Sequence, residues 1–182
     1  MLRMGATLKT HFEQFASYNR WANGRLYEAA FALSDSDYRR DVGVFFGSLH
    51  RTLNHLLVAD RIWLKRLTGE GEHPDRLDAI MHEDRSQLAL ARAEEDERIV
   101  RFVASLDETT LAGTLKYANR TGQQFEQSRN DILAHLFNHQ THHRGHAHAI
   151  LSIVTGREPP SLDMLGMQRG LPAPDLRALA AG

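Results

Sequence analysis

Four long segments of this 182-residue chain carry apolar residues at three- and four-residue spacing, the period of an α-helix that packs on one face. They cover residues 7–33, 48–67, 84–106 and about 128–154. Connectors of moderate length join them, and neither an internal repeat nor a low-complexity linker divides the chain. We therefore predict an all-α fold, a four-helix bundle formed as a single domain over residues 1–182.

Local signals mark where the predicted helices begin and end. Ser48 is a suitable N-cap for the second helix, and Gly69 follows its last turn. Residues 69–83 are rich in glycine, proline and charge, which predicts a loop. In the tail, 161–182, we expect one more short helix at Leu162–Gln168 and a frayed Ala-rich end.

One segment, 112–128, breaks the helical period. Two short runs, Thr114–Tyr117 and Gln123–Glu126, flank turn residues at Asn119–Gly122, which predicts a short β-hairpin before the last long helix. Because two strands alone are only marginally stable, the hairpin should pack against the helices.

Composition and charge exclude several classes of protein. The chain has no cysteine, so it forms no disulfide, thiolate nucleophile or cysteine-type zinc site, and a reducing compartment such as the cytoplasm is expected. Residues 1–14 do not contain the apolar core of a secretory signal, and no apolar run reaches the roughly 18 residues of a membrane span. A net charge of −1 with mixed signs argues against a nucleic-acid surface.

Five of the eleven histidines fall within residues 135–146 of the predicted fourth helix. His139 and His143 lie one turn apart on the same face, with Cβ atoms about 5–6 Å apart, so their imidazoles can converge on one ion. His135 and His146 flank this pair, but one ion cannot reach both ends of the row. The middle pair is therefore the favoured half of a metal site.

A third ligand must come from another helix, because one helical face cannot surround an ion. The second helix offers His50 and His55, which are about 140° apart on the helical wheel, so only one should face inward. His55 lies among small residues that leave room for a pocket, which makes His50 the weaker candidate. We predict that His55 completes a three-histidine centre for a divalent transition metal; Zn²⁺ or Ni²⁺ is favoured, with Fe²⁺ and Cu²⁺ as alternatives.

Two metalloenzyme classes do not fit the fourth helix. The run from His139 to His143 has the ligand spacing of an HExxH metalloprotease, but Gln140 stands where the glutamate base would be. An amide cannot accept a proton from water, so the protease interpretation fails. The Glu-x-x-His pairs of di-iron bundles are also missing from the second and fourth helices. His142 is the candidate acid/base residue, and His148 lies on the opposite face.

Other polar residues in the helices need an explanation. Asp60 is the other candidate acid/base residue, but it is about 140° from His55 on the helical wheel and is expected instead to form a structural ion pair with Arg144 or Arg61. Asn19, on the apolar face of the first helix, either lines a cavity or is a hydrogen-bonded core amide. The highly charged run 91–98 is expected to be a solvated face of the third helix.

Three stretches of the chain together resemble the DinB-like (DNA-damage-inducible) family, over about residues 8–168. The stretches are Asn54–Trp63, His135–Gly145 and Tyr18–Asn23. The resemblance implies a four-helix bundle, often a homodimer, with a three-histidine metal centre. Carried over residue by residue, its ligands would be His55, His139 and His143, the same set that the helical wheel favours.

The resemblance also implies a range of chemistry. Family members include thiol-dependent transferases and isomerases that use bacillithiol or mycothiol, as well as many proteins without a known reaction. The family name refers to induced expression and does not imply DNA binding. This chain departs from the pattern at His146, where many relatives carry glutamine.

Three functions remain open from the sequence. The first is a metal-dependent enzyme, a thiol-dependent transferase or a hydrolase, that acts on a small molecule and that could use a low-molecular-weight thiol. The second is a bundle whose ion is structural, stored or sensed without turnover. The third is a pH-responsive dimer surface of histidines without a metal.

Overall fold

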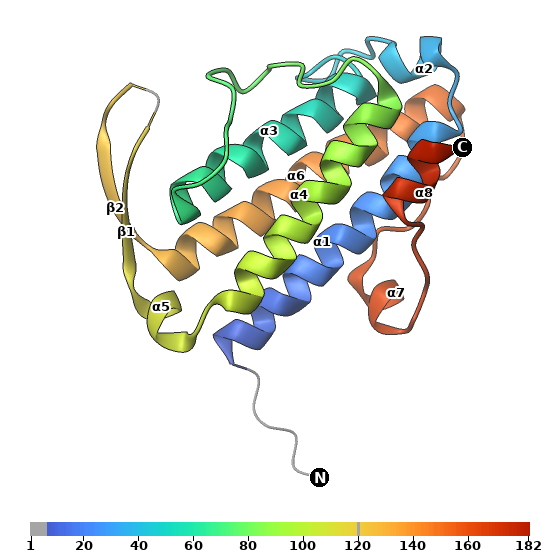
Figure 1. The fold of residues 1–182 in the computed structure, drawn as a ribbon. Coiled ribbons are helices and arrows are strands. Elements are labelled where there is room, and N and C mark those ends of the chain that lie inside the picture. Colours follow the sequence, from blue (N-terminus) through green and yellow to red (C-terminus); the bar gives the residue numbers. More distant parts are fainter. Residues whose placement is uncertain (1–6, 120) are drawn as a thin grey trace.

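The computed structural model describes residues 7–119 and 121–182. Residues 1–6 and Arg120, which falls within the predicted turn, lie outside the described residues. As predicted, the fold is all-α with one short hairpin before the last long helix (Figure 1). The long helices are α1 (Leu8–Phe31), α3 (Leu49–Thr68), α4 (Arg85–Ser105) and α6 (Arg129–Thr155). The short ones are α2 (Asp35–Arg39), α5 (Glu108–Ala112), α7 (Met164–Gln168) and α8 (Leu176–Ala181).

The helix ends follow the capping signals in the sequence. The side chain of Ser48 accepts a hydrogen bond from the backbone N–H of Arg51 at 3.3 Å and so caps α3. Gly69 ends α3 with φ of 78° and Gly156 ends α6 with φ of 63°, the left-handed conformation that glycine adopts at little cost. These local signals explain why the predicted bounds were close.

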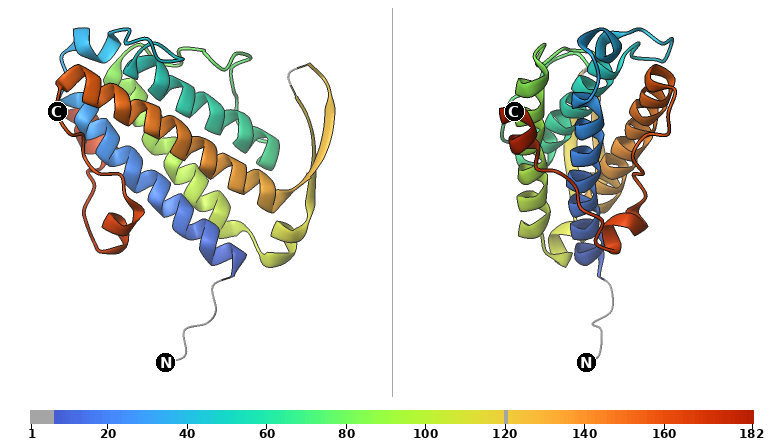
Figure 2. Two further views of the ribbon diagram at one scale, coloured as in Figure 1. Left: turned by 180° about the vertical axis from the view of Figure 1, so that it is seen from behind. Right: turned by 90° about the vertical axis from the view of Figure 1, so that its right-hand side faces the viewer.

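The four long helices pack so that α1 and α3 each contact both α4 and α6. Helices α3 and α4 run in the same direction, as Figure 1 and the left view of Figure 2 show. The chain must therefore return along the length of the bundle between them, and residues 69–83 form this crossover. The predicted loop thus has a fixed place, across the bundle beside α3.

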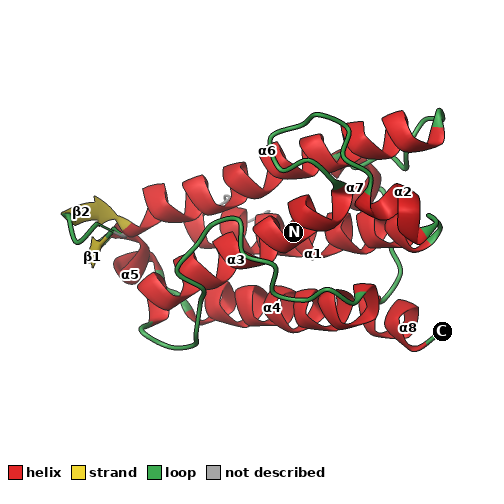
Figure 3. Ribbon diagram, turned by 90° about the horizontal axis from the view of Figure 1, so that it is seen from above, coloured by secondary structure: helices red, strands yellow, loops and turns green. Residues whose placement is uncertain are grey.

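The hairpin projects beyond one end of the bundle (Figure 3). Strands β1 (Thr114–Ala118) and β2 (Gln124–Ser128) pair antiparallel, with Tyr117 opposite Phe125. The ring of Tyr117 lies 5.5 Å from the ring of Trp63 on α3. The hairpin therefore packs against a helix, as its marginal size requires.

Two expectations about exposure were wrong. The charged run 91–98 is not a solvated face, because Arg92 and Asp96 are each only 1% exposed. The Ala-rich end does not fray, because α8 packs on α4 and buries Leu176 to 5% exposure. Helix α4 contacts α1, α3 and α8, so it buries more of its circumference than one apolar stripe predicts.

The core has three layers along the bundle axis. One apolar cluster contains Leu26 and Leu53, and another contains Leu64 and Phe137. Buried polar residues occupy the turns between these clusters on all four long helices. In the part of the chain that the structure describes, no helix is both long and apolar enough to cross a membrane.

Candidate metal centre

The three histidines predicted as ligands lie together in the folded chain. His55 of α3 and His139 and His143 of α6 each offer a nitrogen, and these nitrogens lie within 4.8 Å of one another. The ring of His55 is 5.2 Å from that of His139 and 4.4 Å from that of His143. The packing of α3 on α6 therefore brings together a group that the chain separates by more than eighty positions.

The nitrogens of this cluster carry lone pairs without partners. The Nδ1 of His55 lies 2.8 Å from the carbonyl oxygen of Leu77, and since a carbonyl only accepts, this nitrogen holds the proton. The Nε2 of His55 is then an acceptor, and it is buried with no hydrogen-bond partner. The Nδ1 atoms of His139 and His143 are also buried without partners. Ring nitrogens without partners beside one another fit a bound cation.

The electrostatic environment keeps the three imidazoles neutral. Burial, reinforced by neighbouring histidines, lowers the pKa of His139 to about 4 and that of His143 to about 3. Burial also lowers the pKa of His55. A metal ion needs the unprotonated ring, so these residues are ready to bind a metal at neutral pH without first losing a proton.

The crossover from α3 to α4 orients His55. The side-chain oxygen of Asn54 accepts hydrogen bonds from the backbone N–H groups of Met81, at 2.8 Å, and His82, at 3.1 Å. These bonds hold the segment that places the Leu77 carbonyl on His55. No local signal in the sequence assigns this role to Leu77, although Asn54 belongs to the stretch that resembles the family.

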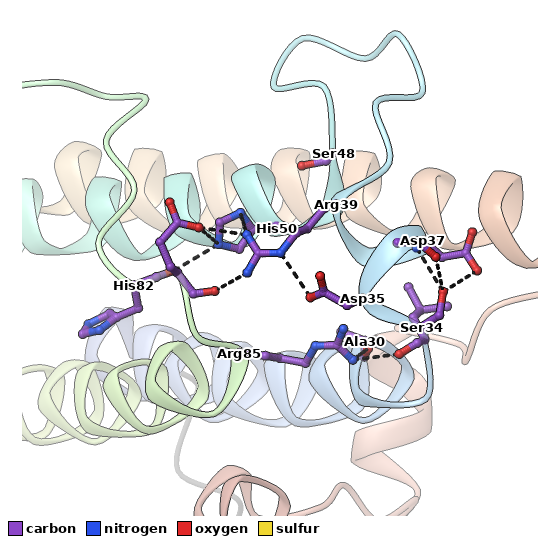
Figure 4. A network of polar contacts seen from close by, with 12 residues as sticks. Ala30, Ser34, Asp35, Asp37, Arg39, Ser48, His50, His82 and Arg85 are labelled. Atoms are coloured by element: carbon purple, nitrogen blue, oxygen red, sulfur yellow. Dashed lines mark hydrogen bonds and ion pairs between the residues drawn. The ribbon is translucent and has the colours of Figure 1, made fainter.

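His50 belongs to the anchoring of the same crossover and not to the cluster. Its Nε2 lies 3.1 Å from the carbonyl oxygen of His82, and its Nδ1 lies 3.4 Å from Nη1 of Arg39 (Figure 4). Both ring nitrogens therefore already have partners. This fits the prediction that only one of the two histidines of α3 faces the metal centre.

The ring of Phe46 covers one side of the histidine cluster, a contact that the sequence did not indicate. The ring of Phe46 stacks on His55, with centroids 4.0 Å apart and planes at 25°, and lies 5.5 Å from the ring of His143. Phe46 is itself buried. It shields the two imidazoles from water and thereby adds to the burial that lowers their pKa values.

The remaining histidines of α6 lie around the cluster. His142, His143 and His146 also bring nitrogens within 4.8 Å of one another, but all three are on one helix and His142 is exposed. One helical face cannot enclose an ion, so this second group is a less complete site. His135 and His139 line a cavity of about 320 Å³ that opens beside the cluster.

A second group of buried polar side chains lies beside the histidines, and we call it the buried polar cluster. Its members are Asn19, Asn23, Asp60, Arg92, Asp96, Gln140 and Arg144. Arg92 forms ion pairs with Asp60, at 2.7 Å, and Asp96, at 3.0 Å. Two guanidinium groups balance two carboxylates, which is how proteins tolerate charges away from water.

The expected ion pair of Asp60 exists, but its predicted partners were wrong. Asp60 pairs with Arg92 of α4, whereas Arg61 pairs with Glu95 at 3.5 Å and Arg144 donates to the amide oxygen of Asn19. Asp60 has this partner because the charged run 91–98 of α4 turns one face into the core, where Arg92 reaches Asp60. Asn19 is the hydrogen-bonded core amide of the two alternatives, and it also donates to Asp96 at 3.2 Å.

The buried polar cluster also fixes the position of the three histidines. Gln140 directly follows His139, and its Nε2 donates to Asp60 and, at 3.0 Å, to the carbonyl oxygen of Leu56. Leu56 in turn directly follows His55. These hydrogen bonds join α6 to α3 next to the three histidines, so they set the distance across which the imidazoles face one another.

Comparison with known proteins agrees with this arrangement. A sequence profile described as the DinB family matches residues 4–173. The chain belongs to the DinB family. It is also 25% identical over 142 residues to Protein DinB of Bacillus subtilis (strain 168), covering 74% of this chain and 80% of that relative. Membership in the DinB family, together with the cluster of His55, His139 and His143, fits a metal-binding protein.

Proposed function

We propose that this DinB-family protein is an enzyme that depends on a divalent transition metal held by His55, His139 and His143. One observation carries the proposal: three neutral imidazoles from two helices, that of His55 buried and those of His139 and His143 half-buried, converge beside a cavity, and each has a buried nitrogen without a partner. Three protein ligands leave a coordination position open, which is the arrangement of a catalytic site. Imidazole ligands favour Zn²⁺ or Ni²⁺, with Fe²⁺ as an alternative.

The ion and the protein have separate tasks in this proposal. A divalent ion at this position lowers the pKa of a coordinated water or thiol and so supplies a nucleophile near neutral pH. The chain orients His55 through the Leu77 carbonyl and excludes water with Phe46. His142 is the proposed acid/base residue, because its exposed ring lies 4.8 Å from that of His143 and can exchange protons with solvent.

The reaction class has two candidates that the geometry serves equally. A low-molecular-weight thiol as co-substrate makes the protein a thiol-dependent transferase, which fits its family. Water in the same position makes it a hydrolase. In either case the substrate is a small molecule, because a cavity of about 320 Å³ beside His139 is at the small end of the usual range for ligand pockets.

The alternative is a metal-binding or sensing bundle without turnover. The fold favours the enzyme, because the apolar clusters and the buried polar cluster hold α3 against α6 without the help of an ion. A structural ion normally supplies free energy that its fold lacks. The cavity beside the ligands has no purpose in a purely structural site.

The family resemblance and the composition support further parts of the proposal. We propose one domain over residues 1–182, a homodimer and a cytoplasmic location. We propose neither a nucleic-acid partner nor a membrane partner, since a net charge of −1 provides no excess of positive charge for either. Sedimentation of the purified protein measures the dimer directly, and a monomer at every concentration contradicts it.

The decisive experiment combines metal analysis with a search for turnover. Protein purified without added metal should contain about one transition-metal ion per chain, and a metal-free preparation would favour the third hypothesis, a histidine surface without metal. A broad panel of electrophiles and esters is then tested with and without thiols, before and after removal of the ion. Turnover that disappears on removal and returns on reloading supports an enzyme; no turnover across the panel favours the binding protein.

A further inference from the structure

Arg66 is a half-buried cation that lines the cavity beside the three histidines. Among the described residues it makes no ion pair and no side-chain hydrogen bond, whereas Arg61 on the same helix pairs with Glu95 at 3.5 Å. No aspartate or glutamate lines this cavity, although Asp75 lines an adjoining one with Arg66. A guanidinium group that is partly removed from water without an anion lacks the partner that such groups normally have.

Aromatic rings hold the guanidinium group in place. Its carbon lies 4.5 Å from the ring centroid of Trp63 and 5.0 Å from that of Tyr117 in the hairpin. Such contacts stabilise the cation while they leave the edge of the guanidinium plane, with its N–H donors, free. The hairpin therefore has a task at this site, because it brings one of the two rings that fix Arg66.

The cavity connects Arg66 to the proposed metal centre. His139, His135, Trp63 and Arg66 all line it. The ring of His135 lies 5.8 Å from that of His139 and 5.0 Å from that of Trp63, so the rings form a continuous row from the ligands towards Arg66. One small molecule that occupies this cavity can touch His139 with one end and Arg66 with the other.

We propose that Arg66 binds the carboxylate of an acidic substrate or thiol whose other end reaches the metal centre. A planar guanidinium group binds the two oxygens of a carboxylate through parallel hydrogen bonds. The assignment rests on the metal centre proposed above for the far end of the ligand, but the positions of Arg66 and its aromatic partners do not depend on any ion.

The length of the ligand follows from the helix. Arg66 lies about three turns after His55 on α3, which is about 16 Å of helical rise. The long side chain shortens this separation, because side chains on a helix lean towards its N-terminus, which is the direction of His55. The thiol and the carboxylate of a matching ligand should therefore be separated by roughly five to ten methylene groups.

The test uses the protein loaded with Co²⁺, whose absorption reports thiolate binding. Straight-chain mercaptocarboxylates with two, five and ten methylene groups are titrated beside mercaptoalcohols of the same lengths. At the matching length the carboxylate should bind about tenfold more tightly than the alcohol, as expected for hydrogen bonds to a charged group. Arg66→Gln should reduce this ratio to about one and leave the alcohols unaffected, and Arg66→Lys should restore part of it.

Lys65→Gln is the matched control, because it removes a positive charge from the same helical turn at a residue that does not line the cavity. It should leave the ratio unchanged. Equal binding of acids and alcohols at every length, or a preference that survives Arg66→Gln, overturns the proposal.

A second measurement separates this inference from the metal proposal. In metal-free protein, the Arg66 side-chain N–H resonance, assigned through Arg66→Gln, is followed by NMR while the same acids and alcohols are added. A shift that only the acids cause supports binding at Arg66, and no shift overturns it. If no thiol changes the Co²⁺ absorption, the metal proposal fails, and the NMR result still decides the role of Arg66.

Discussion

The buried polar cluster, on all four long helices, and the three-histidine cluster, on α3 and α6, lie side by side, yet only the first contains opposite charges that pair with one another. In the first, each guanidinium group and carboxylate meets an opposite charge or an amide, although single atoms such as Nε of Arg92 and Oε1 of Gln140 have no hydrogen-bond partner. In the second, each histidine keeps a buried nitrogen with no partner. Burial of charges that pair with one another indicates a structural task, and convergence of neutral imidazoles with unpartnered ring nitrogens indicates a site for a ligand.

The two groups are also linked. Gln140 and Arg144 of the polar cluster directly follow His139 and His143, so each pair of neighbours on α6 sends one side chain into the core and one to the site. The fold can therefore keep the histidines unsatisfied because the residues behind them are held firmly. The following predictions test this division, beginning with the largest effect.

Removal of one charge from the polar cluster should have the largest effect on stability. Asp60→Ala leaves Arg92 with less compensation in a site where both side chains are almost fully buried, and this should lower the free energy of unfolding by about 3–5 kcal/mol. Urea denaturation of metal-free protein measures it. Asp35→Ala, which breaks the exposed pair with Arg39, is the control and should leave the midpoint nearly unchanged. A loss below about 1 kcal/mol for Asp60→Ala would show that the cluster is not structural.

Removal of one of the proposed metal ligands should have a large effect on metal binding and a smaller effect on stability. His139→Ala should weaken metal binding by more than the roughly 10–100-fold that outer partners contribute, because it deletes one of three ligands. Its metal-free form should lose less stability than Asp60→Ala does. Metal content after gel filtration and urea denaturation give the two values, with His148→Ala, on the opposite face of α6, as the control. If His139→Ala retains its metal, the assigned ligands are wrong.

A smaller effect on metal affinity is expected when the hydrogen bonds that hold the crossover are removed. Asn54→Ala removes the acceptor that holds the backbone N–H groups of Met81 and His82, so the Leu77 carbonyl no longer orients His55. Metal affinity, measured against a competing chelator, should fall about 10–100-fold. Unchanged affinity would mean that His55 is oriented without the crossover.

The smallest effect concerns pH. Because burial lowers the pKa of His139 to about 4 and of His143 to about 3, the unfolded chain binds more protons than the folded one between those values and about 6.5. The contribution of these histidines to the free energy of unfolding of the metal-free protein therefore decreases as pH falls through this window. Burial raises the pKa of Asp60, which acts in the opposite direction.

A difference measurement isolates the histidines in that experiment. The pH dependence of the urea midpoint from pH 7 to pH 5 is compared between the natural chain and a variant with His139→Asn and His143→Asn. The variant should lose less stability on acidification. Identical slopes would show that the two rings are not desolvated in the metal-free protein.

Sequence reasoning succeeded where the signal was local. The helical period and the caps gave the four long helices, and the turn residues gave the hairpin. The i, i+4 spacing of His139 and His143 placed two imidazoles on one face of α6. The choice of His55 over His50 depended on small neighbours and on the family resemblance, and the structure brings His55 alone to the pair.

Sequence reasoning failed where the partner of a residue lies on another helix. The run 91–98 has the composition of a solvated face, and nothing local reveals that Arg92 and Asp96 meet Asp60, Asn19 and Asn23 in the core. For the same reason no local feature of the sequence indicates a binding role for Arg66. Its contact with the ring of Tyr117 depends on how the hairpin packs against α3.

The amino-acid sequence by itself therefore determined the helices, their ends, the family and the residues able to bind a metal, because periodicity, capping and side-chain chemistry act over a few neighbouring residues. Tertiary structure alone decided which polar groups are satisfied and which are left open. The parallel course of α3 and α4 sends residues 69–83 across the bundle. The Leu77 carbonyl of this crossover accepts a hydrogen bond from Nδ1 of His55, so the proton stays on Nδ1 and Nε2 keeps its lone pair. Whether a buried polar group has a hydrogen-bond or ion-pair partner depends on residues that come from distant parts of the chain.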